Sequence, residues 1–178
     1  MLIRPVGPTD RAALWHLIQP VIRAGETYPL PRDMSEAAAL AYWLQADHEV
    51  FLAEEPDRPV GTYYLRANQK GGGAHVANCG YVTAGDREGR GVARAMAAHS
   101  FARADARGFL AMQFNFVVAS NERAVRLWQK LGMEVVGCLP GAFAHPRHGL
   151  VDAFVMFRRL ADLVGAGERD PIAATLAL

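Results

Sequence analysis

Glu88-Gly89-Arg90-Gly91-Val92-Ala93 is the stretch that decides the fold of this chain. It follows an apolar run that predicts a strand over 74–83, and it opens into a helix predicted over 92–107. Glycine lets a backbone approach an anion closely, and the unpaired N–H groups of a first helical turn point at it. The stretch therefore predicts a phosphate site; a Gly-rich turn before a surface helix is the alternative. Three arginines add positive charge around the turn: Arg87, Arg90 and Arg94.

Composition predicts one compact domain, at residues 1–164, followed by a tail at 165–178 with weak structure signals. The chain has 178 residues, of which 51% are hydrophobic and 21% charged, enough to bury a full core. A formal net charge of +1 without a Lys/Arg run gives no electrostatic footprint for nucleic acid. No apolar stretch approaches the ~20 residues that span a bilayer, and the N-terminus lacks the apolar region of a signal peptide. We therefore expect a cytoplasmic protein that binds neither nucleic acid nor membrane.

Cysteine and histidine spacing predicts no metal site. Cys79 and Cys138 lie on separate predicted strands without a Cys-x-x-Cys or Cys/His spacing, so we expect buried thiols without a chemical role. His145 and His148 lie on a proline-containing segment without a nearby acid or cysteine cluster, which is poor ligand geometry.

Strand and helix signals alternate along the chain. Before the quoted stretch we expect a strand at 2–6, a helix that Pro20 kinks or splits, a second helix starting at Ser35, and a hairpin of strands 49–54 and 60–66. After it we expect a strand at 112–118, a helix capped by Asn121, and strands 134–139 and 151–158 joined by a long loop over 140–149. The core-facing stripe predicted on the helix at 92–107 consists of Val92, Ala95, Met96, His99, Ala102 and Ala106.

The quoted stretch resembles the acyl-CoA loop of the GCN5-related N-acetyltransferases, the GNAT family, which reads Gln/Arg-x-x-Gly-x-Gly/Ala. Glu88 is the one misfit, because the family has Gln or Arg there. A second family signature, Asn-x-x-Ala-x-x-Leu-[Tyr]-x-x-x-Gly-[Phe], falls on Asn121, Ala124, Leu127, Trp128, Gly132 and Met133. Two motifs at the right separation are far more specific than either alone, and the resemblance covers almost the whole chain.

The resemblance implies an α/β fold, the GNAT fold, with acetyl-CoA as cosubstrate. This fold has a mixed, mostly antiparallel sheet of six to seven strands, splayed between the fourth and fifth strands, with helices on both faces. The splay leaves backbone groups of the fourth strand free to bond pantetheine and thioester. The implied cofactor-binding residues are Tyr81, Val82, Thr83, Arg87, Glu88, Gly89, Arg90, Gly91, Val92, Ala93, Arg94, Asn121 and Trp128.

Residues 114–121, 124–128 and 136–142 resemble a subgroup of bacterial and fungal GNAT enzymes that acetylate small amino acids and proline analogues such as azetidine-2-carboxylate. This resemblance implies acetyl transfer to a small-molecule amine by direct attack, without a covalent enzyme intermediate. Asn115 and Asn121 are the implied catalytic residues; the first binds the substrate carboxylate or the oxyanion, and the second holds the cofactor arm or the thiolate. The expected substrate-binding residues are Glu26, Tyr28, Asn78, Tyr81 and Asn115.

Trp128 stands where many family members carry a tyrosine that protonates the thiolate. Indole N–H does not protonate a thiolate, so we expect protons to leave through water.

Other interpretations stay open. Asn115 could pair with backbone at the splay, and Asn121 could be a plain helix cap. The chain could be a protein N-terminal acetyltransferase or an acetyl-CoA-binding module without turnover, and a homodimer fits because dimers are common for this fold. A dinucleotide oxidoreductase is excluded, because Arg94 stands where the third glycine of Gly-x-Gly-x-x-Gly belongs.

Overall fold

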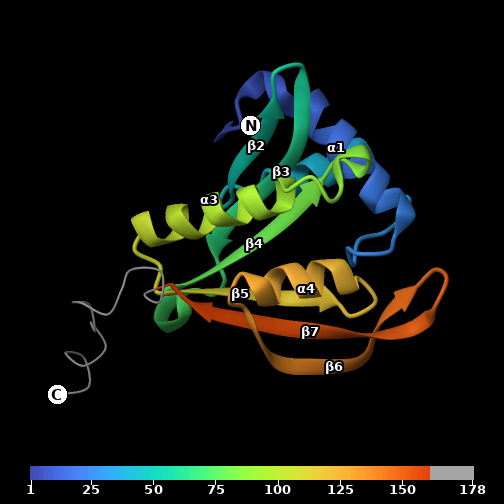
Figure 1. Cartoon of the computed structure of the whole chain (residues 1–178). Coiled ribbons are helices and arrows are strands. Elements are labelled where there is room, and N and C mark those ends of the chain that lie inside the picture. Colours follow the sequence, from blue (N-terminus) through green and yellow to red (C-terminus); the bar gives the residue numbers. More distant parts are fainter. Residues whose placement is uncertain (161–178) are drawn as a thin grey trace.

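A seven-stranded sheet forms the centre of the molecule, and the computed structural model describes residues 1–160 (Figure 1). In spatial order its strands are β1 (Leu2–Pro5), β2 (Glu49–Glu55), β3 (Arg58–Ala67), β4 (Val76–Thr83), β5 (Ala111–Val118), β7 (Gly149–Arg159) and β6 (Glu134–His145). Neighbouring strands are antiparallel except β4 and β5, which run parallel. The predicted mixed, mostly antiparallel sheet is confirmed.

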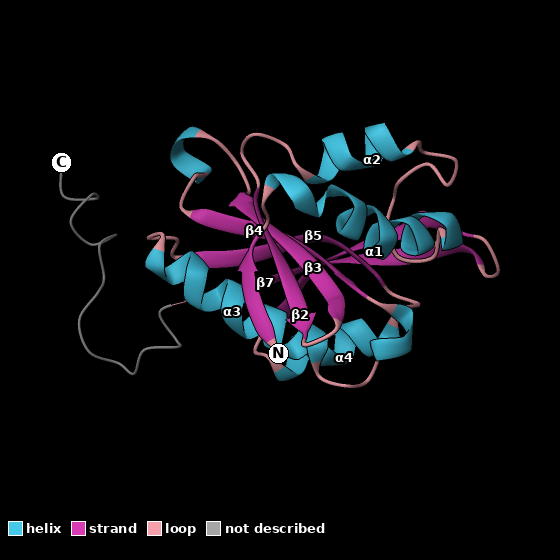
Figure 2. Cartoon of the chain, turned by 90° about the horizontal axis from the view of Figure 1, so that it is seen from above, coloured by secondary structure: helices cyan, strands magenta, loops and turns pink. Residues whose placement is uncertain are grey.

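Two helices cover each face of this sheet (Figure 2). The helices α1 (Arg11–Ala24) and α2 (Glu36–Trp43) pack on one face, in a core that includes Tyr64 and Val82. The helices α3 (Val92–Ala106) and α4 (Glu122–Lys130) pack on the other. Single-turn 3₁₀ helices occur at Pro8–Asp10, Gly71–Gly73 and Gly85–Arg87. The predicted helices on both faces are confirmed.

Side-chain caps begin α2 and α4. Ser35 Oγ accepts a hydrogen bond from Ala38 N–H at 3.2 Å, and Asn121 Oδ1 accepts one from Ala124 N–H at 3.2 Å. Each cap satisfies one of the N–H groups that a helix start leaves unpaired.

The strands β4 and β5 pair over two residues only, Val76 with Ala111 and Ala77 with Met112, and then diverge (Figure 1). On its other side β5 pairs with β7, with an irregularity between Phe114 and Val117. The predicted splay is therefore present, and it begins at Asn78.

The predicted long loop over 140–149 is wrong. The strand β6 continues to His145, and β7 begins at Gly149, where His145 pairs with Gly149. Pro140 and Gly141 are turn signals in sequence, but the hairpin accommodates them in a bulge between Leu139 and Phe143. Gly141 has φ +58°, and its N–H bonds Asp152 Oδ1 at 2.9 Å.

Three smaller expectations also change. Helix α1 continues through Pro20 without a split. The buried stripe of α3 is rotated, because Ala97, Ser100, Phe101 and Ala104 are buried whereas Ala102 and Ala106 are exposed; its many alanines leave the apolar face poorly marked in sequence. Cys79 is buried as predicted, but Cys138 is exposed because β6 is an edge strand.

The predicted tail, 165–178, lies outside the described residues. Within residues 1–160, no helix has both the length and the hydropathy needed to cross a membrane.

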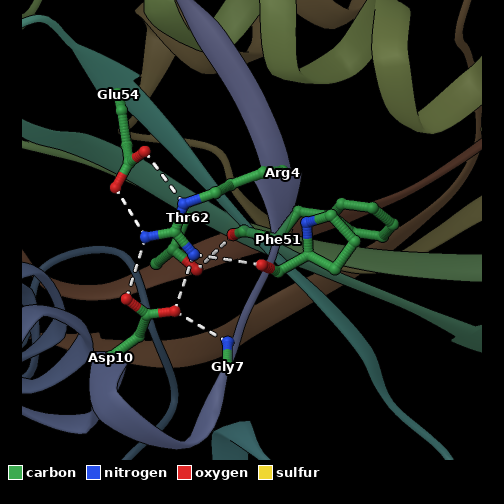
Figure 3. A network of polar contacts seen from close by, with 7 residues as sticks. Arg4, Gly7, Asp10, Phe51, Glu54 and Thr62 are labelled. Carbon is green, nitrogen blue, oxygen red and sulfur yellow. Dashed lines mark hydrogen bonds and ion pairs between the residues drawn. The ribbon is translucent and has the colours of Figure 1, made fainter.

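An ion-pair network ties β1 to β2 and to the start of α1 (Figure 3). Arg4 bonds both oxygens of Asp10, at 2.7 and 2.9 Å, and both oxygens of Glu54, at 2.9 and 2.7 Å. Asp10 also accepts the N–H of Gly7 at 2.7 Å. The Arg4 guanidinium, with help from Gly7 N–H, lowers the pKa of Asp10 to about 2 from its ordinary 3.8.

Asp10→Asn should lower the free energy of unfolding at neutral pH by about 1 kcal/mol, because Arg4 is one third exposed and water screens the pair. Folding depresses this pKa, so the stabilisation is present above pH 3.8 and is lost as pH falls from 3.8 through 2. Urea unfolding across this pH range checks it. Asp57→Asn, at an exposed turn residue, is the control, and a parallel loss of stability in the wild type and Asp10→Asn would contradict the assignment.

Candidate functional site

A cavity of about 650 Å³ occupies the opening between β4 and β5 and extends to the start of α3. Residues of the α1–α2 connection, α2, β3 and α4 complete its wall. It brings together most of the predicted site residues: Tyr28, Asn78, Tyr81, Val82, Thr83, Arg87, Glu88, Gly89, Gly91, Val92, Ala93, Arg94, Asn115, Asn121 and Trp128. Glu26 and Arg90 do not line it.

The turn before α3 has two glycines in left-handed backbone conformations. Gly89 and Gly91 have φ of +77° and +85°, which side-chain-bearing residues rarely adopt. The first intrahelical bond of α3 runs from Ala95 N–H to Gly91 O at 3.0 Å. The N–H groups of the first three helical residues, 92–94, therefore have no intrahelical acceptor. They form the positive end of the helix dipole, and their residues line the cavity.

Two charged residues of this turn are held by ion pairs. Arg87 Nε bonds Glu55 at 2.9 Å, and Glu88 accepts a bond from Arg123 of α4 at 2.8 Å. Arg94 lines the cavity without an ion pair among the described residues. The positively polarised or charged groups beside this turn therefore include the backbone N–H groups of 92–94, Arg94 and Arg123.

Backbone groups of alternate β4 residues face the opening. The bonds from Asn68 N–H to Val76 O, 2.7 Å, and from Ala84 N–H to Val60 O, 2.9 Å, show that even-numbered β4 residues bond β3. The backbone of Val82 therefore bonds β3. The prediction that it faces the opening is wrong. Odd-numbered residues face the opening, and the Tyr81 carbonyl there accepts a bond from Tyr28 Oη at 3.0 Å.

The side chain of Tyr81 lies on the α3–α4 face of the sheet. Its hydroxyl is 2.6 Å from Ser100 Oγ, and its ring packs 5.0 Å from Trp128 and 5.7 Å from Phe114, centroid to centroid. Trp128 is buried. Because the Tyr81 hydroxyl is hydrogen-bonded to Ser100 in the core, the position of this side chain does not support the predicted contact with the substrate.

A chain of amides crosses the opening from β4 to β5 and β3. Asn78 Nδ2 donates to the Gln113 carbonyl at 2.9 Å, just where the β4–β5 pairing ends. Gln113 Nε2 donates to Asn115 Oδ1 at 2.8 Å, and Asn115 Nδ2 donates to Asn68 Oδ1 at 2.6 Å. The side chain that bonds backbone at the splay is therefore Asn78, whereas the sequence left this role open for Asn115. The Asn115 amide is oriented instead by the side chains of Gln113 and Asn68.

Glu26 does not line the cavity. It forms an ion pair with Arg147 at 2.9 Å, which joins the α1–α2 connection to the β6–β7 hairpin. The predicted contact of Glu26 with the substrate amine is therefore not supported by its placement.

Three residues that line the cavity or bond its amides were not identified from sequence: Asn68, Arg66 and Arg123. Strand alternation carries a signal for Arg66 and Asn68, because they follow Tyr64 at steps of two residues and so share its face. For Arg123 the sequence carries none, since its role depends on how α4 lies against the glycine turn.

This geometry agrees with the comparison to known protein families, in which residues 14–133 match the Acetyltransferase (GNAT) family. The chain belongs to this family. It is accordingly an acyltransferase, an N-acetyltransferase with acetyl-CoA as cosubstrate.

Relatives of this GNAT chain include enzymes and solved structures. A GCN5-related N-acetyltransferase from Kribbella flavida is 35% identical, with a TM-score of 0.85 over 89% of this chain and 96% of that chain. N-acetyltransferase aca1 of Schizosaccharomyces pombe is 26% identical over 161 residues, 81% of this chain and 77% of the relative. A phosphinothricin acetyltransferase from Sinorhizobium meliloti, in complex with acetyl-CoA, shares the fold at 17% identity, with a TM-score of 0.77 over 96% of this chain and 94% of that chain.

Glu88→Gln should tighten acetyl-CoA binding about threefold to fivefold at low ionic strength. The change removes a negative charge beside the glycine turn and releases Arg123, and the effect should shrink as salt screens both. Isothermal titration checks this. Glu134→Gln is the control, because Glu134 is an exposed acid of β6 that does not line the cavity. Weaker binding by Glu88→Gln would instead mean that Glu88 orients Arg123 for the phosphates.

Proposed function

We propose that this GNAT enzyme transfers acetyl from acetyl-CoA to the amine of a small molecule, an amino acid or a proline-like analogue. The observation that carries the proposal is the continuous cavity. It has an anion-binding helix start at one end and, across the β4–β5 opening, a set of oriented amides at the other. A thioester extending from the helix start into the opening would meet an amine held beside Asn115.

The proposed chemistry is direct attack. The amine nitrogen forms a bond to the acetyl carbon while the carbon–sulfur bond breaks; the amine proton passes to water and the thiolate takes a proton from water. The loop amides hold the pyrophosphate, Asn115 bonds the carboxylate or the developing oxyanion, and Asn121 holds the cofactor arm or the thiolate. Asn121 Oδ1 caps α4, and its NH₂ has no partner among residues 1–160, so capping and cofactor binding are compatible.

The tyrosines of the cavity are hydrogen-bonding groups rather than bases in this proposal. Burial raises the pKa of Tyr28 and of Tyr64 well above the ordinary 10.0, which keeps both phenols neutral. In the described residues the acid lining the cavity is Glu88, which pairs with Arg123 at the phosphate end. The amine therefore gives up its proton to water.

Two alternatives remain, a protein N-terminal acetyltransferase and an acetyl-CoA-binding module without turnover. Incubation with acetyl-CoA and a panel of free amino acids and peptides, followed by free thiol, separates all three. Release with free amino acids supports the proposal, release with peptides alone supports the first alternative, and binding without release supports the second.

Asn115→Ala should lower kcat/KM for the amino acid about 10-fold to 100-fold, because it removes hydrogen bonds made to a charged or developing oxyanionic group. Acetyl-CoA affinity should stay within about twofold, since Asn115 is on β5 and not on the glycine turn before α3. Steady-state kinetics and titration check both. Gln129→Ala, at an exposed amide outside the cavity, is the control, and loss of acetyl-CoA binding by Asn115→Ala would contradict the assignment.

The cytoplasmic location, the homodimer and the domain boundary at residue 164 stay predictions. Exposed apolar side chains of the edge strand β6, Val135, Val136 and Leu139, are consistent with contact between two copies.

A further inference from the structure

Arg66 lies at the acceptor end of the cavity. It is on β3, opposite Asn78 of β4 in register, and it lines the cavity. Two residues earlier on the same face, Tyr64 packs edge-on against Trp43 and Tyr42 of α2, at centroid distances of 5.0 and 6.4 Å. Arg66 therefore lies beside Asn78 in the sheet and two residues along β3 from an aromatic cluster.

The Arg66 side chain has unused donors. Its Nε is buried without a hydrogen-bond partner, the single such buried side-chain atom in residues 1–160. The nearest acid is Asp47, whose Oδ2 is 3.9 Å from Nη1, beyond hydrogen-bond distance, and whose side chain is 60% exposed. By contrast, Arg87 and Arg123 of the same cavity bond carboxylates at 2.9 and 2.8 Å. A buried, unpaired N–H of a charged group is costly unless a ligand satisfies it.

The groups around Arg66 favour an anion. Its cavity neighbours Tyr64, Asn78 and Asn115 are neutral, and the acid lining the described cavity is Glu88, which is paired at the phosphate end. A guanidinium presents donors in a planar fork that matches both oxygens of a carboxylate. Arg66 thus has no acid within hydrogen-bond distance among the described residues.

We propose that Arg66 binds the carboxylate of the acceptor, so that the site takes α-amino and α-imino acids and discriminates against amines that lack a carboxylate. Asn78 and Asn115 lie on the β4 and β5 sides of the same end, where the amine meets the thioester. The inference rests on the proposed function and makes it narrower: the anchor of the substrate is the carboxylate rather than the amine.

Matched acceptor pairs test the proposal: L-proline against pyrrolidine, and glycine against methylamine. The wild type should acetylate each acid with a higher kcat/KM than its amine. Arg66→Met should lower kcat/KM for the acids about 10-fold to 100-fold, mainly through KM, and leave the amines and the affinity for acetyl-CoA within about twofold. Arg66→Lys should recover part of the activity on acids. Arg11→Met, at an exposed arginine without an ion pair in the described structure, is the control.

Equal losses for acids and amines, or full activity of Arg66→Met on acids, would overturn the carboxylate role. Failure of the proposed function gives a different result, because the wild type would then release thiol with no acceptor of the panel. In that case titration of the CoA-bound protein with L-proline decides the inference. Binding by the wild type that Arg66→Met loses supports it, and no binding, or equal binding by both, overturns it.

Discussion

Gly91→Val should lower the affinity for acetyl-CoA about 100-fold, with the fold retained. Gly91 has φ +85°, and a β-branched residue there is strained by about 1–2 kcal/mol. Its side chain would stand at the helix start, where the N–H groups of residues 92–94 have no intrahelical acceptor and bind the pyrophosphate in the proposed function. Losing two hydrogen bonds to a charged group, at about 1.5 kcal/mol each, gives a change of this size. Isothermal titration with acetyl-CoA measures it.

Gly85→Ala is the matched control for the glycine turn. Gly85 precedes the turn without a positive φ, and a Cβ there would meet open space. Its affinity for acetyl-CoA should stay within about twofold of the wild type. If Gly91→Val binds as tightly as Gly85→Ala, the helix start is not the phosphate site.

Trp43→Ala should lower the free energy of unfolding by about 3–5 kcal/mol, the largest effect on stability that we expect. Trp43 is 2% exposed and packs against Tyr64 and Tyr28. Its Nε1–H bonds Thr62 Oγ1 at 3.2 Å. Thr62 in turn bonds the Phe51 carbonyl at 2.8 Å (Figure 3). Both tyrosines line the cavity, so KM for the amino acid should rise as well. Urea unfolding and steady-state kinetics check the two effects.

Trp15→Ala is the control for this change, because Trp15 is a half-buried tryptophan of α1 whose ring faces Arg23 at 5.6 Å. Its loss should cost about 1 kcal/mol and leave KM unchanged. Comparable effects from the two variants would mean that Trp43 does not support the acceptor wall.

The sequence carries the phosphate loop and both family motifs because these depend on local chemistry. Gly89 and Gly91 hold backbone angles that only glycine adopts readily. Asn121 caps α4, the helix that begins at the next residue. Such features act over a few residues and are readable in sequence, and the family resemblance that they carry implies the fold and the splay between β4 and β5.

Contacts between distant segments could not be predicted in the same way. Glu88 is a misfit of the motif in sequence, but in the fold it pairs with Arg123, 35 residues away. Glu26 pairs with Arg147, 121 residues away, rather than with the acceptor. Arg66 gains its place only when β3 lies in register with β4. Each depends on packing that local propensity does not encode.

A crystal structure with CoA and L-proline bound tests the central claim most directly. The pyrophosphate should accept hydrogen bonds from the N–H groups of residues 92–94, the pantetheine should lie in the β4–β5 opening, and the sulfur should lie near Asn121 with the proline nitrogen facing it beside Asn115. A thiol that ends outside this opening, or a proline bound elsewhere, would contradict the account.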